Sequence, residues 1–245
     1  MTLAACGLTE NAFENDGFVQ DDVVAAQVNP ADPAANELLI PPLLEPAQDG
    51  VARFDLSLGE SSHDFGSGVL AETVSYNGQS ILGPTLLWRS GSDVEINVTN
   101  ELDEGTTAHW HGADVPAEDD GGPHSRIEPG QTWVADFEVI QPAATLWYHP
   151  HMMGTSAEQV FHGAAGMIIV EDDNPAAAAL PSTYGVDDIP VILQDREFTD
   201  DGQLNFEIDN DDNGDLNPDL TVNATIDPYT TVPAGPVRLR LLNGS

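Results

Sequence analysis

Short runs of alternating apolar and polar residues constrain the fold of this chain more than any other feature of its sequence. Phe54, Leu56 and Leu58 alternate with polar neighbours, and related apolar runs follow at 93–98, 133–139 and 166–170. Residues at every second position of a strand share one face. Turn signals separate the runs, at Asn77-Gly78, Gly83-Pro84, Ser90-Gly91 and Glu128-Pro129-Gly130. Short strands at this spacing predict an all-β sandwich or barrel, and no long stretch of helical periodicity competes with it.

The charge of the chain excludes two classes of partner. It carries 42 acidic residues against six arginines and no lysine, a formal net charge of -36 at pH 7. A surface this acidic repels nucleic acid and anionic membranes, so we expect neither as a partner. We interpret the acidity as a heavily hydrated surface adapted for solubility; an acidic surface that gathers metal cations is the alternative.

The chain is long enough for about two domains, since it has 245 residues of which 40% are hydrophobic. We interpret residues 1–45 as a truncated lipoprotein-type signal and an acidic tether, whose last part, Leu38–Leu44, packs on the body as an extended strip. Residues 46–173 are expected to form a first domain, 174–188 a linker, and 189–245 a partial second domain. The second domain offers four or five strands, whereas a closed sandwich needs about seven.

Cys6 is the single cysteine, so no disulfide can form within the chain. Its setting, Leu3-Ala4-Ala5-Cys6-Gly7, resembles the lipobox of bacterial lipoproteins, in which the cysteine carries the lipid. The resemblance implies an exported protein, periplasmic or at the cell surface, that contacts the membrane only through a lipid on Cys6. The five preceding residues are too few for a complete signal peptide, so either the start of the signal is missing or the match is chance.

Four of the seven histidines form two pairs, His109-Trp110-His111 and His149-Pro150-His151. In a strand, residues i and i+2 point to one face about 6.5–7 Å apart, so each pair can present two imidazoles to the same cavity. Two such pairs on neighbouring strands would bring four nitrogen donors together, a set that suits copper, zinc, iron or nickel. The spacing predicts a metal site and leaves the metal open.

The residues around these pairs resemble the copper motifs of multicopper oxidases. The segment Thr106-Thr107-Ala108-His109-Trp110-His111-Gly112 is similar to the first motif, and Leu146-Trp147-Tyr148-His149-Pro150-His151 to the second. The similarity extends from about Ile40 to Ser245 and is nearest to the bacterial copper-efflux oxidase, bilirubin oxidase and laccase-like group. Further similar segments are 77–78, 83–86, 120–123, 141–145, 163–170 and 238–244.

This resemblance implies a fold, an activity and a set of ligands. The fold would be all-β, built of cupredoxin-like Greek-key sandwiches, the first complete and the second partial. The activity would couple one-electron oxidation of phenolic or aromatic substrates, or of cuprous ions, to the four-electron reduction of dioxygen to water. By motif position, His109 would ligate the type 2 copper, and His111, His149 and His151 the type 3 pair of a trinuclear cluster. Asp120 matches an acidic residue near the cluster that would orient water and relay protons.

The chain departs from the family pattern in what it lacks. The cluster of the family needs eight histidines, and its type 1 copper needs a cysteine within a His-Cys-His motif. Only the four paired histidines match, and Cys6 lies far from any histidine, so no type 1 site is expected here. We expect the other ligands in a C-terminal cupredoxin domain of the same protein, beyond Ser245. Dioxygen and a small reducing substrate are the other expected partners.

Three alternatives remain open at this point. The chain could be a copper-buffering lipoprotein that uses the two histidine pairs without turnover. It could be a copper-free structural relative that serves in assembly or cell division, although retention of all four motif histidines argues against this. A cluster built between subunits is a third arrangement, but it requires a second domain with the other ligands, and none is seen in the sequence.

Several other residues are expected to lie outside the site. We expect His162 to be solvent-facing or hydrogen-bonded, and His124 and His63 to be surface residues. Met152-Met153 is expected to fill space beside the site rather than to hold copper. The run Asp209–Asp215 resembles the start of a calcium loop, but Leu220 occupies the twelfth position, where a bidentate Glu is expected, so we interpret the run as an acidic turn.

Overall fold

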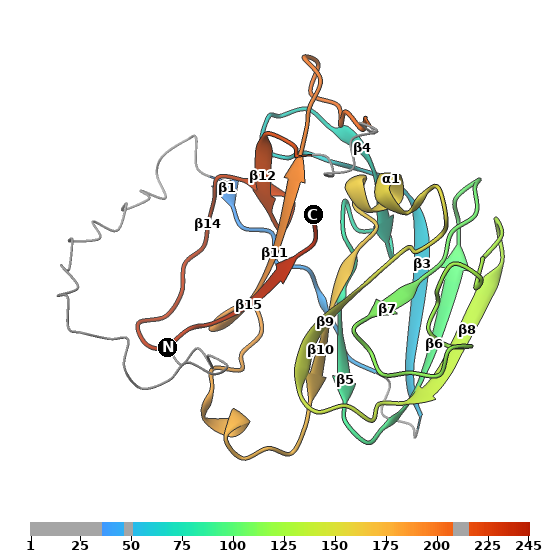
Figure 1. Ribbon diagram of the computed structural model, residues 1–245. Helices are drawn as coiled ribbons and strands as arrows, with labels where there is room; N and C mark the ends of the chain where they lie inside the picture. The colour runs from blue at the N-terminus through green and yellow to red at the C-terminus, as the bar shows by residue number, and fades with distance from the viewer. Residues whose placement is uncertain (1–35, 47–50, 208–215) are drawn as a thin grey trace, which may run out of the picture.

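The computed structural model describes residues 36–46, 51–207 and 216–245 (Figure 1). Within these ranges nearly every element is a strand, and the one α-helix is α1, Ser156–Phe161. The same ranges contain one 3-10 turn, η1, at Ala177–Ala179. No helix in the described ranges is long and apolar enough to cross a membrane. The all-β prediction is confirmed.

The first unit consists of two sheets that face each other. One sheet has four strands in the order β4-β3-β6-β8, and the other has five in the order β2-β5-β10-β9-β7 (Figure 1). The four-stranded sheet comprises β3 (Ala52–His63), β4 (Ala71–Tyr76), β6 (Asp93–Asn100) and β8 (Thr132–Glu138). The five-stranded sheet comprises β2 (Leu43–Leu44), β5 (Thr85–Arg89), β7 (His109–His111), β9 (Ala144–His149) and β10 (Gly166–Glu171).

The core lies between these two sheets and explains the alternation in the sequence. Phe54, Leu56 and Leu58 of β3 are almost fully buried, because the period of two directs all three toward the opposite sheet. Trp110 of β7 and Tyr148 of β9 come from that sheet and belong to the same buried cluster. The inward face of the strands that carry the histidine pairs is therefore fixed by aromatic packing.

A second unit packs against the outer face of the five-stranded sheet. Its main sheet has the order β13-β12-β11-β15, and a second apolar cluster joins it to β10 through contacts that include Met167, Ile169, Ile192 and Ala224. Buried on both faces, β10 is apolar along almost its whole length. The strands of this sheet are β11 (Asp188–Arg196), β12 (Asp219–Val222), β13 (Thr225–Ile226) and β15 (Arg238–Asn243).

Residues 36–46, here called the N-terminal strap, run across both units. The strand β1 (Asn36–Glu37) pairs in parallel with β14 (Pro228–Tyr229) in the second unit, and β2 pairs in parallel with β5 in the first. The main-chain N–H of Leu38 donates to the carbonyl of Tyr229, and the N–H of Thr85 donates to that of Pro42, each at 2.8 Å. The segment expected as an extended strip is thus hydrogen-bonded to both units.

Candidate metal centre

Two adjacent antiparallel strands place the histidine pairs side by side. The register of β7 and β9 sets His109 opposite His149, and β7 forms the end of the five-stranded sheet (Figure 1). Alternation along β7 turns Trp110 into the sandwich, where it is fully buried, while the histidines on either side lie on the other face. By anchoring β7 in the core, Trp110 therefore directs the imidazoles of His109 and His111 away from the core.

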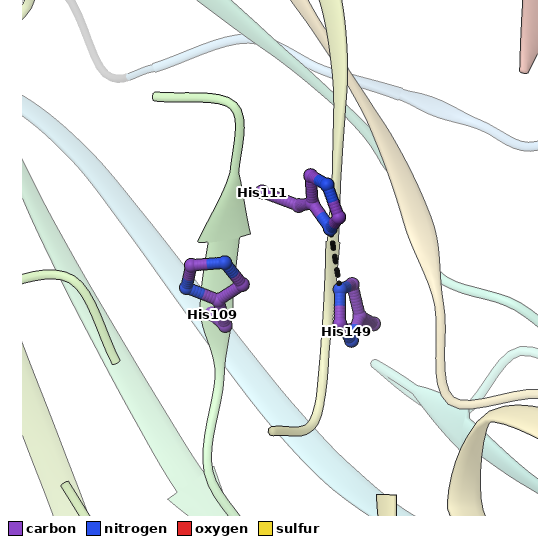
Figure 2. A group of neighbouring side chains, drawn as sticks. All are labelled: His109, His111 and His149. Atoms are coloured by element: carbon purple, nitrogen blue, oxygen red, sulfur yellow. Dashed lines mark hydrogen bonds between the residues drawn. The ribbon is translucent and has the colours of Figure 1, made fainter. Parts of the chain in front are cut away.

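Three of the imidazoles converge on one small volume. One ring nitrogen from each of His109, His111 and His149 lies within 4.8 Å of the others. Figure 2 shows the three side chains close together, with a hydrogen bond between His111 and His149. Nδ1 of His111 lies 3.0 Å from Nε2 of His149. The fourth imidazole, that of His151, has its ring centroid 5.0 Å from that of His109. All four candidate ligands are thus brought together.

Carbonyl acceptors fix the tautomers of two of these rings. Nδ1 of His109 donates to the main-chain oxygen of Asp120 at 2.9 Å, and Nδ1 of His149 donates to that of Pro150 at 2.7 Å. A carbonyl can only accept, so both Nδ1 atoms carry the hydrogen and both Nε2 atoms keep a lone pair. An imidazole ligates a metal ion through such an unprotonated nitrogen.

The pKa values of two histidines keep them neutral. Burial lowers the pKa of His149 to about 4, although its bond to the Pro150 carbonyl acts in the opposite direction. The pKa of His111 is also lowered, first by burial and then by the neighbouring imidazoles of His109 and His151. In both rings the shift favours the unprotonated form that ligation requires.

Asp120 reaches His109 because a glycine follows it. Its carboxylate Oδ2 lies 3.3 Å from Nδ1 of His109. Gly121 has a φ of +70°, and a Cβ placed there would lie 1.7 Å from the carbonyl oxygen of Ala108. Only glycine allows this approach. The loop thus brings both a carbonyl and a carboxylate to one imidazole.

The donor set fits copper. Imidazole nitrogens that converge without a thiolate are suitable ligands for this metal, among others. Because Nε2 of His149 keeps its lone pair, Nδ1 of His111, 3.0 Å away, donates to it, which leaves Nε2 of His111 with a lone pair for a metal ion. Trp147, which the sequence analysis did not single out, lies against the cluster, with its ring centroid 4.0 Å from that of His149. Its position two residues before His149 in a strand is the signal that could have identified it.

The remaining histidines lie outside the cluster. His124 is exposed, as expected, and Nδ1 of His162 donates to the carbonyl of Glu158, one of the two expected settings. The expectation for His63 was wrong, because its ring is half-buried and bonds to Ser80 and to the carbonyl of Ala224 in the second unit.

Of the other residues considered in the sequence, the structure describes the methionines but not Cys6 or the acidic run. Met153 is 85% exposed, so the expectation that it fills space beside the site is wrong, while Met152 is half-buried. The lipid-anchor candidate Cys6 lies outside the described residues, and so does the acidic run 209–215.

Comparisons with known proteins agree with the motifs. A family profile described as multicopper oxidase matches residues 58–175. The chain is 42% identical over 212 residues to the multicopper oxidase mco of Staphylococcus aureus, covering 86% of this chain and 46% of that protein. It is also 38% identical over 209 residues to the cell division protein FtsP of Glaesserella parasuis, covering 85% of this chain and 43% of FtsP. The chain thus spans about half the length of the curated relatives it matches.

Solved structures extend the likeness to the fold. The laccase-like multicopper oxidase CueO from Ochrobactrum sp. superposes with a TM-score of 0.78 at 41% identity, covering 84% of this chain and 46% of CueO. A laccase from Pediococcus acidilactici gives a TM-score of 0.79 at 37% identity, covering 86% of this chain and 46% of the laccase. The cupredoxin-like fold predicted from the sequence is confirmed.

Proposed function

This chain belongs to the multicopper oxidase family and corresponds to roughly the N-terminal half of its curated relatives; from this premise we propose that it supplies half of the ligands of a trinuclear copper site. The whole protein would be a copper-dependent, laccase-like oxidase. The observation that carries the proposal is the convergence of nitrogens from His109, His111 and His149 within 4.8 Å. His151, whose ring adjoins that of His109, completes the half-site.

The residues of this chain would divide the work of the site. His109 would hold the type 2 copper, and His111, His149 and His151 would hold the type 3 pair. Copper would supply the redox chemistry, in which phenolic or aromatic substrates or cuprous ions are oxidised and dioxygen is reduced to water. The Asp120 carboxylate, 3.3 Å from Nδ1 of His109, would orient water and hand on protons.

The rest of the site would come from a C-terminal cupredoxin domain. The matched relatives are about twice as long as the part this chain covers. That domain would provide the other cluster ligands and the type 1 copper at which electrons enter. We accordingly expect the 245-residue chain alone to bind copper without oxidase turnover; turnover by the pure chain would contradict this division.

Copper binding by the purified chain tests the proposal. The double variant His109→Ala/His149→Ala should lose specific copper uptake, because it removes two of the three converging imidazoles. The control His124→Ala, at an exposed histidine outside the cluster, should keep it. Copper content after dialysis and electron paramagnetic resonance measure the outcome, and no intense blue type 1 absorption is expected. Equal uptake by all three proteins would reject the half-site.

A second candidate function has its own support. The matches to FtsP at 38% identity favour a structural relative that works in cell division. The retained histidine cluster favours the oxidase instead. Copper loading of the chain joined to its C-terminal half separates the two, since a metal-free product would favour the structural relative.

A further inference from the structure

The ladder that joins the two histidine-bearing strands reaches a proline at the edge of the site. The pairing of β7 with β9 places His109 opposite His149. One step further along the same register would set Ala108 opposite Pro150. Proline has no N–H, so it cannot donate a ladder hydrogen bond. The pairing of β9 with β7 ends at His149, so the main chain at His151 is not fixed by that ladder.

Just beyond the end of this ladder, the hydroxyl of Thr107 binds the main chain of the second histidine pair. The main-chain N–H of His151 donates to Oγ1 of Thr107 at 2.6 Å. Thr107 is fully buried, whereas His151 is exposed and lies after the last residue of β9. The bond spans 44 residues of sequence and connects the segment before the first histidine pair to the second pair.

The segment that carries this hydroxyl is itself held rigidly. Gln159 of α1, only 2% exposed, donates from Nε2 to Oε1 of Glu104 at 2.8 Å and to the carbonyl of Gly105 at 3.1 Å. Its Oε1 accepts from the hydroxyl of Thr106 at 2.8 Å. Residues 104–107 are therefore bonded to α1 through Gln159. Through Thr107 they are also bonded to His151, at the start of the segment that leads from β9 to α1.

We propose that the Thr107 hydroxyl is a positioning group for His151, which it fixes by accepting the main-chain N–H of that residue just beyond the end of the β7–β9 ladder. The proposal rests on the copper half-site described above. Thr107 is not one of the proposed ligands; it sets where the ring of His151 lies relative to that of His109, 5.0 Å away between centroids. Groups behind the ligands that hold them in place contribute strongly to metal affinity.

The first experiment measures the bond without metal. Thr107→Val keeps the branched shape and removes the acceptor, while Thr107→Ser keeps the hydroxyl. Thr73→Val is the matched control, because Thr73 is also buried and its hydroxyl donates to the Ser80 carbonyl, away from the cluster. After correction for global stability, the His151 amide should exchange about tenfold faster in Thr107→Val, and at the wild-type rate in the other two variants. Unchanged protection in Thr107→Val would overturn the proposal.

The second experiment measures what the bond does for the ligand set. Contacts between the His109 and His151 rings, seen as nuclear Overhauser effects, should weaken in Thr107→Val and persist in Thr107→Ser. Copper affinity, from competition with a chelator, should fall about 10- to 100-fold in Thr107→Val and be restored in Thr107→Ser. Loss of amide protection with unchanged ring contacts and affinity would show a purely structural bond and overturn the positioning role. If the wild-type chain takes up no copper, the proposed function fails, and the ring contacts alone decide the role of Thr107.

Discussion

Gly121 controls how closely the Asp120 loop approaches the strand that carries His109. Its φ of +70° is unfavourable for any residue with a side chain, and an added Cβ would collide with the Ala108 carbonyl. Neither effect can be relieved by rotating a side chain, because the colliding atoms belong to the backbone. The loop and the strand would have to separate, and Asp120 would move away from the imidazole.

Gly121→Ala should therefore cost both stability and site geometry. We expect a loss of at least about 2 kcal/mol in the free energy of unfolding, from the left-handed backbone and the overpacking together. The matched control is Gly130→Ala, which has a φ of +73° with nothing within 4 Å of the added Cβ, so only the backbone contribution remains. Urea unfolding of both variants provides the measurement, and equal losses would argue against the collision.

The lowered pKa of His149 makes stability depend on pH. The folded chain excludes the proton until about pH 4, while the unfolded chain takes it up below about pH 6.5. The unfolded state thus binds more protons in this window, and stability falls as pH falls. Relative to His149→Gln, the wild-type chain without metal should lose about 1.5 kcal/mol between pH 6.5 and pH 5.

Parallel denaturant titrations at several pH values measure this difference. Both proteins share every acidic group, so the comparison cancels the effect of carboxylates. An identical pH dependence in the two proteins would mean that His149 titrates normally.

At the level of elements, Arg240 forms a buried ion pair within the second unit and also contacts the first unit. Arg240 of β15 binds Asp188 of β11 through two hydrogen bonds, of 2.8 and 2.7 Å, and both side chains are nearly inaccessible. A further nitrogen of Arg240 donates to the hydroxyl of Thr145 on β9, at 3.3 Å. Arg240 thus connects the sheet of the second unit with β9, the strand that ends at His149.

Removing one partner of this pair should be costly. Arg240→Ala removes both hydrogen bonds from the buried Asp188 carboxylate and leaves it only the longer contact with the more exposed Arg238, at 3.9 Å, so we expect a loss of about 3 kcal/mol. Arg126→Ala, which removes an exposed pair with Glu128, should cost about 1 kcal/mol or less. The double variant Asp188→Leu/Arg240→Met should recover most of the loss, because no unpaired charge remains. Thermal unfolding of the three variants tests the order; similar effects for Arg240→Ala and Arg126→Ala would contradict it.

The elements that the sequence predicted are those with a strong local pattern. In β3 and β6 the alternation follows directly from one buried face, so the strands could be placed from residues such as Phe54 and Val94. The two His-x-His pairs were equally visible. The register that sets His109 opposite His149 depends on how distant segments pair, so the sequence alone did not provide it. The role of Thr107 was missed for the same reason, because its partner lies 44 residues away.

At the scale of the whole molecule, the net charge of -36 opposes folding. Like charges on a compact body repel one another more than they do on an expanded chain. Added salt screens this repulsion over distances beyond about 10 Å at 0.1 M and about 3 Å at 1 M. The acidic surface therefore couples stability to the ionic strength of the surroundings.

The midpoint of thermal unfolding should rise when sodium chloride is increased from about 0.1 M to about 1 M. Near pH 4, where about half of the carboxylates are protonated, the same change in salt should have a much smaller effect. Calorimetry at both pH values measures the difference. A salt effect of equal size at the two pH values would point to a cause other than charge repulsion.

The N-terminal strap has a consequence for the order in which the molecule is built. Asn36 donates a side-chain hydrogen bond to Ile226, 190 residues further along the chain. Synthesis begins at the N-terminus, so the strap leaves the ribosome long before the strand that receives it exists. Contacts that close so long a loop are slow to form and come after the local ones. The first half of the strap, β1, is therefore made early and reaches its partner strand β14 late, whereas β2 can pair with β5 as soon as the first unit folds.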